Sequence, residues 1–137
     1  MTTIQDVREA IAQAAQEIDG WRASAYVGEQ INPPQIKVSM PAFDPRMVFG
    51  QSRVTHTFRC FAYYTRTAGD AGERALDALA ELTGAGSFIA TVQDEANWST
   101  LDVYYASVTN VGEVSVTQFG TDTAEYFVRP FDVEVCW

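Results

Sequence analysis

His56 and Cys60 are the side chains of this sequence best suited to nucleophilic or acid–base chemistry, and His56 is its only histidine. They lie four residues apart in an alternating run, so a β-strand would place both on one face. At about 3.3 Å per residue their Cα atoms would be about 13 Å apart, too far for a hydrogen bond between a nucleophile and its base. We therefore expect His56 to be a buried histidine with a hydrogen-bond partner, and we expect no catalytic residues.

Metal ligands and paired carboxylates are also sparse. A metal site needs clustered histidine, cysteine or carboxylate side chains, whereas Cys60 and Cys136 lie far apart in the sequence. Asp132 and Glu134 share one face of an expected strand, which leaves a glycosidase-type pair open, although a solvated surface accounts for them as well. We expect no metal.

The glycine-rich run Gly84–Ile89 begins like a dinucleotide-binding fingerprint. Ile89 stands where the third glycine would be, and the run follows an expected helix rather than a strand. The close helix packing and the phosphate geometry of that motif are both lost. We expect no cofactor.

The composition is that of a folded chain with strong negative charge. The 137 residues are enough for one domain, and 18 acidic residues against 9 basic ones give a net charge of −9. The basic residues are scattered from Arg8 to Arg129, so specific nucleic-acid binding is not expected. The beginning of the sequence lacks the apolar core of a signal peptide, and no apolar run reaches the length of a membrane span.

Helices are expected at two main places. Apolar residues recur at three- and four-residue steps from Ile4 to Ile18, and Gly20 is the expected stop. Thr2 or Thr3 is the expected cap, with Gln5 or Asp6 three residues later as its capping-box partner. A second helix is expected from Asp70, capped by Asp70 with Glu73, and its apolar stripe comprises Leu76, Leu79 and Leu82. A further short helical piece is expected within 87–95.

Alternation predicts the strands. The expected strands cover 21–27, 35–40, 53–65, 101–108, 111–119 and 125–137. In 53–65 the even positions form the core face and include Cys60, while in 125–137 the odd positions do. Cys136 then points to the opposite, polar face, which argues against a disulfide with Cys60. Pro130 cannot donate to a ladder, so a free side or a bulge is expected there.

One segment stands out as a candidate contact region. Large apolar side chains alternate with turn residues in Pro41–Gln51, which indicates either a contact loop or a hairpin tip that folds back on its own sheet. With Trp98, from the expected loop 97–99, its apolar residues are the candidate protein-interaction residues: Phe43, Met47, Phe49 and Trp98. The order of elements predicts a single α+β domain over residues 1–137, with a mainly antiparallel sheet and two main helices packed on it.

The chain resembles the tail terminator proteins of long-tailed, siphovirus-type phages that infect actinobacteria. The resemblance begins with the short N-terminal helix and the segment from Trp21 to Pro34, and it continues through Phe58–Thr65 and Gly69–Leu82. It is best at the end, from Gly86-Ser87 through Trp98 and Val108–Gly112 to Phe131–Val135. Pro41–Gln51 does not match the pattern closely.

The resemblance implies a structural protein of the virion, assembled in the host cytoplasm. Its subunits would form a ring, hexameric in that family, that caps the tail tube at the head–tail junction and ends tube polymerisation. Its partners would be copies of itself, the major tail tube protein and a head-completion protein, with DNA passing through the lumen unbound. Head-to-tail ring contacts need two different patches, and an acidic subunit repels DNA. The alternatives are another head–tail connector or tube component, and a small ligand-binding domain or enzyme that uses the sheet face near His56.

Overall fold

The structure is a computed structural model that describes residues 2–28, 31–43, 53–118 and 123–137. The described helices are α1 (Ile4–Gln16), α2 (Asp70–Leu79) and α3 (Phe88–Gln93), with 3-10 turns η2 (Arg66–Ala68) and η3 (Glu95–Trp98). The strands are β1 (Arg22–Ser24), β2 (Gln35–Ser39), β3 (Thr55–Thr65), β4 (Tyr105–Val111), β5 (Ser115–Gln118) and β6 (Glu125–Cys136). The expected α+β class is confirmed, with α3 as the short helical piece.

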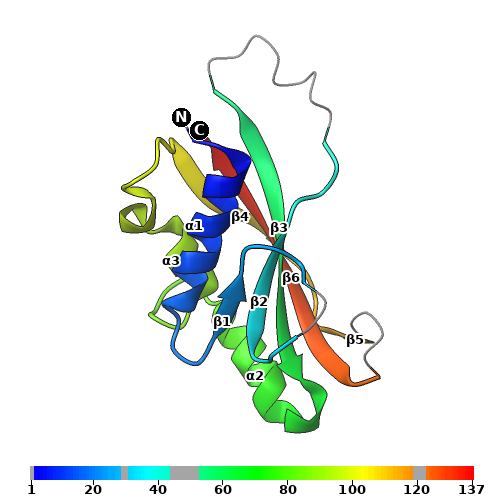
Figure 1. Ribbon diagram of the computed structural model, residues 1–137. Coiled ribbons are helices and arrows are strands. Elements are labelled where there is room, and N and C mark those ends of the chain that lie inside the picture. Colours follow the sequence, from blue (N-terminus) through cyan, green and yellow to red (C-terminus); the bar gives the residue numbers. More distant parts are fainter. Residues whose placement is uncertain (1, 29–30, 44–52, 119–122) are drawn as a thin grey trace.

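Two long antiparallel strands, β3 and β6, form the middle of the sheet (Figure 1). The strand order is β1-β2-β3-β6-β4, and β5 also pairs with β6. The pairs are antiparallel except that β1 runs parallel to β2. On its outer side β6 therefore pairs with β4 along its C-terminal half and with β5 along its N-terminal half.

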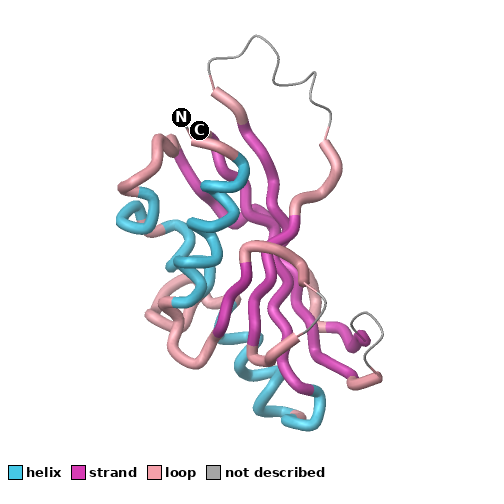
Figure 2. The backbone as a smooth tube through the Cα atoms, viewed as in Figure 1, coloured by secondary structure: helices cyan, strands magenta, loops and turns pink. Residues whose placement is uncertain are grey.

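The helix α1 begins where its sequence signal lies. The Thr3 side chain accepts from the Asp6 backbone and the Asp6 carboxylate accepts from the Thr3 backbone, which completes the predicted capping box. Val7, Ile11 and Ala15 form its buried stripe. Figure 2 shows the helices gathered on one side of the strands.

The core lies between the helices and one face of the sheet. Alternating residues of β3 and the odd residues of β6 face it, and Phe58 pairs directly with Val133 while Cys60 pairs with Phe131. This confirms the predicted core faces. Cys136 lies on the other face, as expected, and it is buried there beside its pairing partners Thr55 and Tyr105.

The second helix differs from the expectation at both ends. Its N-cap is Gly69, which has no side chain to cap with, and Asp70 is already the first helical residue, so the expected Asp70–Glu73 capping pair is wrong. The helix ends at Leu79 and Leu82 lies beyond it, 76% exposed. Leu82 is therefore not part of the apolar stripe.

A second, smaller cluster covers part of the opposite face of the sheet. Tyr63, Tyr126 and Val128 pack there under Ile31, with Phe61 beside them. The even positions of β6 were expected to be polar. Tyr126 and Val128 are buried instead, because the chain between β1 and β2 brings Ile31 over this part of the face.

The outer edge of the sheet is interrupted opposite Pro130. The ladder with β4 ends at Phe131 and the ladder with β5 begins at Val128, and between them Gly112 donates its N–H to the Pro130 carbonyl. A register shift in β4, between Val108 and Asn110, lies nearby opposite Asp132. The irregularity predicted at Pro130 is confirmed. Two local predictions are wrong. Asn97 and Trp98, expected in the loop 97–99, belong to the 3-10 turn η3, and β4 begins at Tyr105 rather than near residue 101.

Candidate interaction surface

His56 and Cys60 are core residues. The His56 ring lies between Phe43 and Trp137, with ring centroids 4.5 and 5.1 Å away. Burial lowers the pKa of His56 and raises the pKa of the fully buried Cys60 thiol. Both groups are therefore held in their neutral forms by the same desolvation.

Asp132 and Glu134 of β6 each have a separate partner. Asp132 accepts from the Arg59 guanidinium at 2.9 Å, and Glu134 accepts from the Tyr105 hydroxyl at 2.6 Å. The hydrogen bond to Glu134 is the main reason why the pKa of Tyr105 is raised. Within the described ranges, no three histidine, cysteine or acidic side chains lie close enough together to hold a metal ion. In the same ranges, no helix is long and apolar enough to cross a bilayer.

The four predicted contact residues differ in where the structure places them. Phe43 is 48% exposed while it contacts His56, so it lies at the edge of the core. Met47 and Phe49 lie outside the described residues. Trp98, which we expected on a contact surface, is only 6% exposed and donates its indole N–H to the Val92 carbonyl at 2.7 Å.

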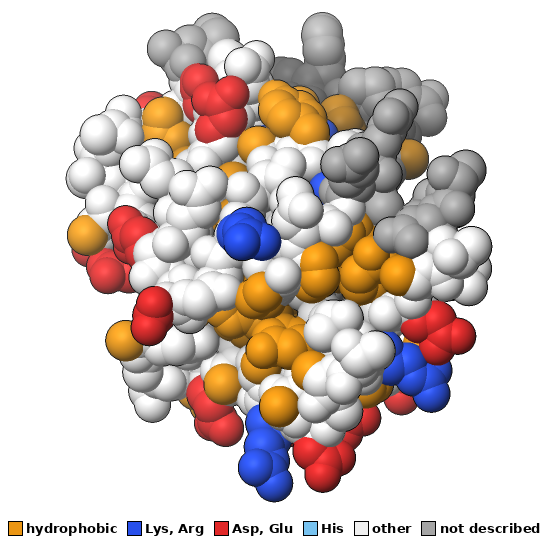
Figure 3. All heavy atoms as spheres, turned by 60° about the horizontal axis from the view of Figure 1, so that its bottom comes forward, with side chains coloured by type: hydrophobic (Ala, Val, Ile, Leu, Met, Phe, Trp, Pro, Cys, Tyr) orange, Lys and Arg blue, Asp and Glu red, His pale blue; other side chains and the backbone are white. Residues whose placement is uncertain are grey.

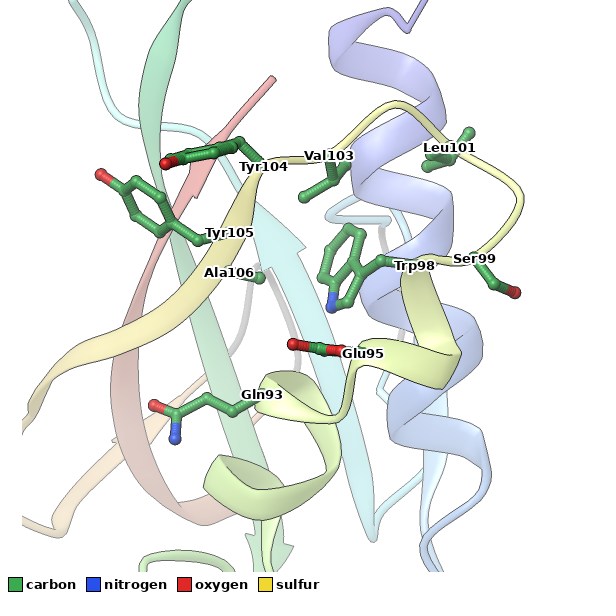
Figure 4. A pocket seen from close by; sticks show the side chains of 9 residues that line it. All are labelled: Gln93, Glu95, Trp98, Ser99, Leu101, Val103, Tyr104, Tyr105 and Ala106. Carbon is green, nitrogen blue, oxygen red and sulfur yellow. The ribbon is translucent and has the colours of Figure 1, made fainter.

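Trp98 forms the inner wall of a groove of about 430 Å³ beside β4. Figure 4 shows the groove between η3 and the start of β4, with Glu95 and Trp98 on one side and Tyr105 and Ala106 on the other. Its other lining residues are Gln93, Ser99, Leu101, Val103 and Tyr104. Tyr104 is 69% exposed at the rim, and the Arg53 guanidinium lies 4.6 Å from the centre of its ring.

At each of the two edges of the sheet, a glutamine side chain forms a hydrogen bond with a backbone group of the edge strand. Gln16 of α1 donates to the Ala23 carbonyl of β1 at 3.0 Å, and Gln93 of α3 accepts from the Val108 N–H of β4 at 3.1 Å. Exposed edge strands tend to pair with other chains unless they are protected. Each of these two glutamines occupies one backbone group of an edge strand, at Ala23 of β1 and at Val108 of β4.

The short strand β5 lacks such protection. Ser115 and Thr117 pair with Val128 and Tyr126, whose backbone N–H and C=O groups point toward β5. Backbone groups alternate in direction along an antiparallel strand, so those of Val116, between Ser115 and Thr117, point away from the sheet. Among the described residues, nothing hydrogen-bonds to those groups. The sequence of β5 carries no charge and no proline, and the Val116 side chain is 44% exposed. This edge is open to strand addition.

The sequence indicated neither the groove nor the position of the open edge. The available signals were the neighbouring Tyr104 and Tyr105 at the start of a strand, and the uncharged run Ser115–Gln118. Their meaning depends on β4 and β5 being edge strands, which alternation alone does not reveal. No protein-family model matches the chain, and a search of curated proteins found no match.

Proposed function

We propose that this protein is a structural subunit that forms a ring with its own copies and acts as a tail terminator of a long-tailed phage. The resemblance along the sequence suggests this role. The observation that best supports it is the open edge of β5, where Val116 presents an exposed apolar side chain and unpaired backbone groups. A structural subunit of this kind works through such surfaces and needs no cofactor.

The distribution of side chains is compatible with an assembly contact. Figure 3 shows hydrophobic side chains gathered in the middle of the face that lies below in Figure 1, with charged side chains around them. Exposed apolar patches with a polar rim are typical of protein–protein contacts. In the proposed ring, the apolar surface and β5 would meet neighbouring subunits or the tube.

The net charge of −9 suits a subunit around a DNA channel. Like-charge repulsion would keep the passing genome from adhering to the wall. The proposed partners are therefore other copies of the chain, the tail tube protein and a head-completion protein at the head–tail junction. DNA would pass without being bound.

Sedimentation velocity and native mass measurements test the proposal, with the purified chain alone and with preformed tail tubes. The proposal predicts a closed oligomer of several copies, either free or assembled on the tubes. A chain that stays monomeric in both samples and neither binds nor limits tubes would refute it.

A further inference from the structure

We propose that the groove beside β4 binds an extended, positively charged segment of a partner protein, which adds to the sheet edge at Ala106 and places an arginine or lysine side chain against Glu95. This inference concerns a different edge from β5 and does not depend on the proposed ring.

The backbone of Ala106 is available for pairing. Val108 points its N–H outward, since that group donates to the Gln93 side chain. In an antiparallel strand the residue two positions earlier faces the same way, so the N–H and C=O of Ala106 also point outward, into the groove that Ala106 lines. Among the described residues these two groups have no hydrogen-bond partner.

The side chain of Gln93 lies where the backbone of an added strand would lie. Its side-chain oxygen lies 3.1 Å from the Val108 nitrogen, which is where a carbonyl of a neighbouring strand would be. One position of this edge is therefore already completed by a side chain, and the next position, Ala106, is left to a partner. A segment that pairs at Ala106 extends the same pattern.

The groove has room for a side chain of such a segment. Successive side chains of an extended segment point to opposite sides, so alternate ones would enter the groove. Its inner wall is the buried ring of Trp98, with Leu101 and Val103 beside it. These apolar walls suit the methylene stem of a long side chain, whose charged end can stay near the rim.

The charge at the groove favours a cation. Glu95 is the charged residue among those that line it, and Figure 4 shows its carboxylate pointing between Gln93 and Trp98 toward β4. Glu95 has no ion-pair partner within the described part of the chain. The exposed Asp102 follows the lining residue Leu101, and Arg53 is the cation that contacts the rim, on the Tyr104 ring. An acidic segment or a nucleic acid would meet repulsion at Glu95.

Peptide titration followed by amide NMR signals tests the inference on the full chain. The probe is the peptide acetyl-Thr-Val-Arg-Val-Thr-amide, and its matched control has glutamate in place of arginine. We expect the arginine peptide to shift the amide signals of residues 104–108 and to bind about ten-fold more tightly than the glutamate peptide. Methylation of the backbone nitrogens of the arginine peptide should abolish binding, because strand addition needs those groups.

Two variants of the protein test whether the preference for the arginine peptide comes from Glu95. Glu95→Gln should weaken binding of the arginine peptide about five-fold, and the control Glu113→Gln, an exposed acid next to β5, should leave it unchanged. The inference is overturned if the arginine and glutamate peptides bind equally, if the shifts map elsewhere, or if neither peptide binds up to millimolar concentration.

Discussion

Gly112 lies directly against Pro130, and this contact separates β4 from β5 along the outer edge of the sheet. The Gly112 N–H donates to the Pro130 carbonyl at 2.8 Å. A Cβ on Gly112 would overlap the Cγ of Pro130 and lie 2.9 Å from its Cδ. The strand β4 thus ends, three residues before β5 begins, at a place where only glycine fits against the proline ring.

Gly112→Ala should destabilise the chain by about 1–3 kcal/mol, because the added methyl group must displace a proline ring or the backbone beside it. Urea unfolding followed by circular dichroism measures the change. Gly86→Ala is the matched control, since nothing lies within 4 Å of a Cβ at that glycine. Equal stability of the Gly112→Ala and Gly86→Ala variants would contradict the packing described for Pro130.

Arg129→Met should also lower the free energy of unfolding, by about 1–3 kcal/mol, because Arg129 donates to the Gly112 carbonyl and to Asp77. The guanidinium ties the turn between β4 and β5 to α2, and its side chain is largely buried. The control is Arg66→Met, which removes the exposed pair with Glu125 and should cost at most about 1 kcal/mol. A larger loss in the Arg66 variant than in the Arg129 variant would be evidence against this arrangement.

The stability of the chain should depend on the protonation of His56. Burial lowers the pKa of His56 in the folded chain, so the unfolded chain takes up the proton more readily. The contribution of neutral His56 is complete above its ordinary pKa of about 6.5, and it is lost as the pH falls from there toward the lowered folded-state pKa. Urea unfolding of the wild-type chain and of His56→Gln at pH 7.5, 6.5 and 5.5 measures this contribution to the free energy of unfolding. The stability advantage of the wild type should shrink as the pH falls, whereas parallel profiles would show that His56 does not titrate in this way.

Local sequence signals predicted the parts of the fold that depend on near neighbours. The capping box of Thr3 and Asp6 is formed by residues three apart, and the core faces of β3 and β6 follow from alternation within each strand. The buried even positions of β6 could not be predicted in this way. Tyr126 is buried because Ile31, far away in the sequence, crosses the same face.

The candidate contact surfaces likewise depend on tertiary packing, which local sequence signals do not predict. Trp98 was predicted as a contact residue, yet it is buried by the packing of η3 against the core, with its N–H bonded to Val92. The roles of Gln16 and Gln93 depend on which strands are at the edges of the sheet. Strand order is set by tertiary pairing, so a single sequence gives no direct signal for these edge caps.

Val116→Lys should abolish the proposed assembly while the monomer stays folded. Lysine on an edge strand discourages pairing with another chain, and the Val116 backbone groups face away from β6, so its internal ladder is kept. Thr109→Lys is the control, because Thr109 is also exposed but lies in β4. Sedimentation velocity measures the assembly, and circular dichroism shows whether the monomer stays folded. Full assembly of the Val116→Lys variant would show that β5 is not a subunit contact.

Electron microscopy of the purified protein mixed with preformed tail tubes tests the central claim most directly. The account predicts rings with a central opening, seated at tube ends that no longer elongate when tube protein is added, and it predicts that Val116→Lys removes them. Tubes with bare ends that continue to grow, with no rings in the field, would contradict it.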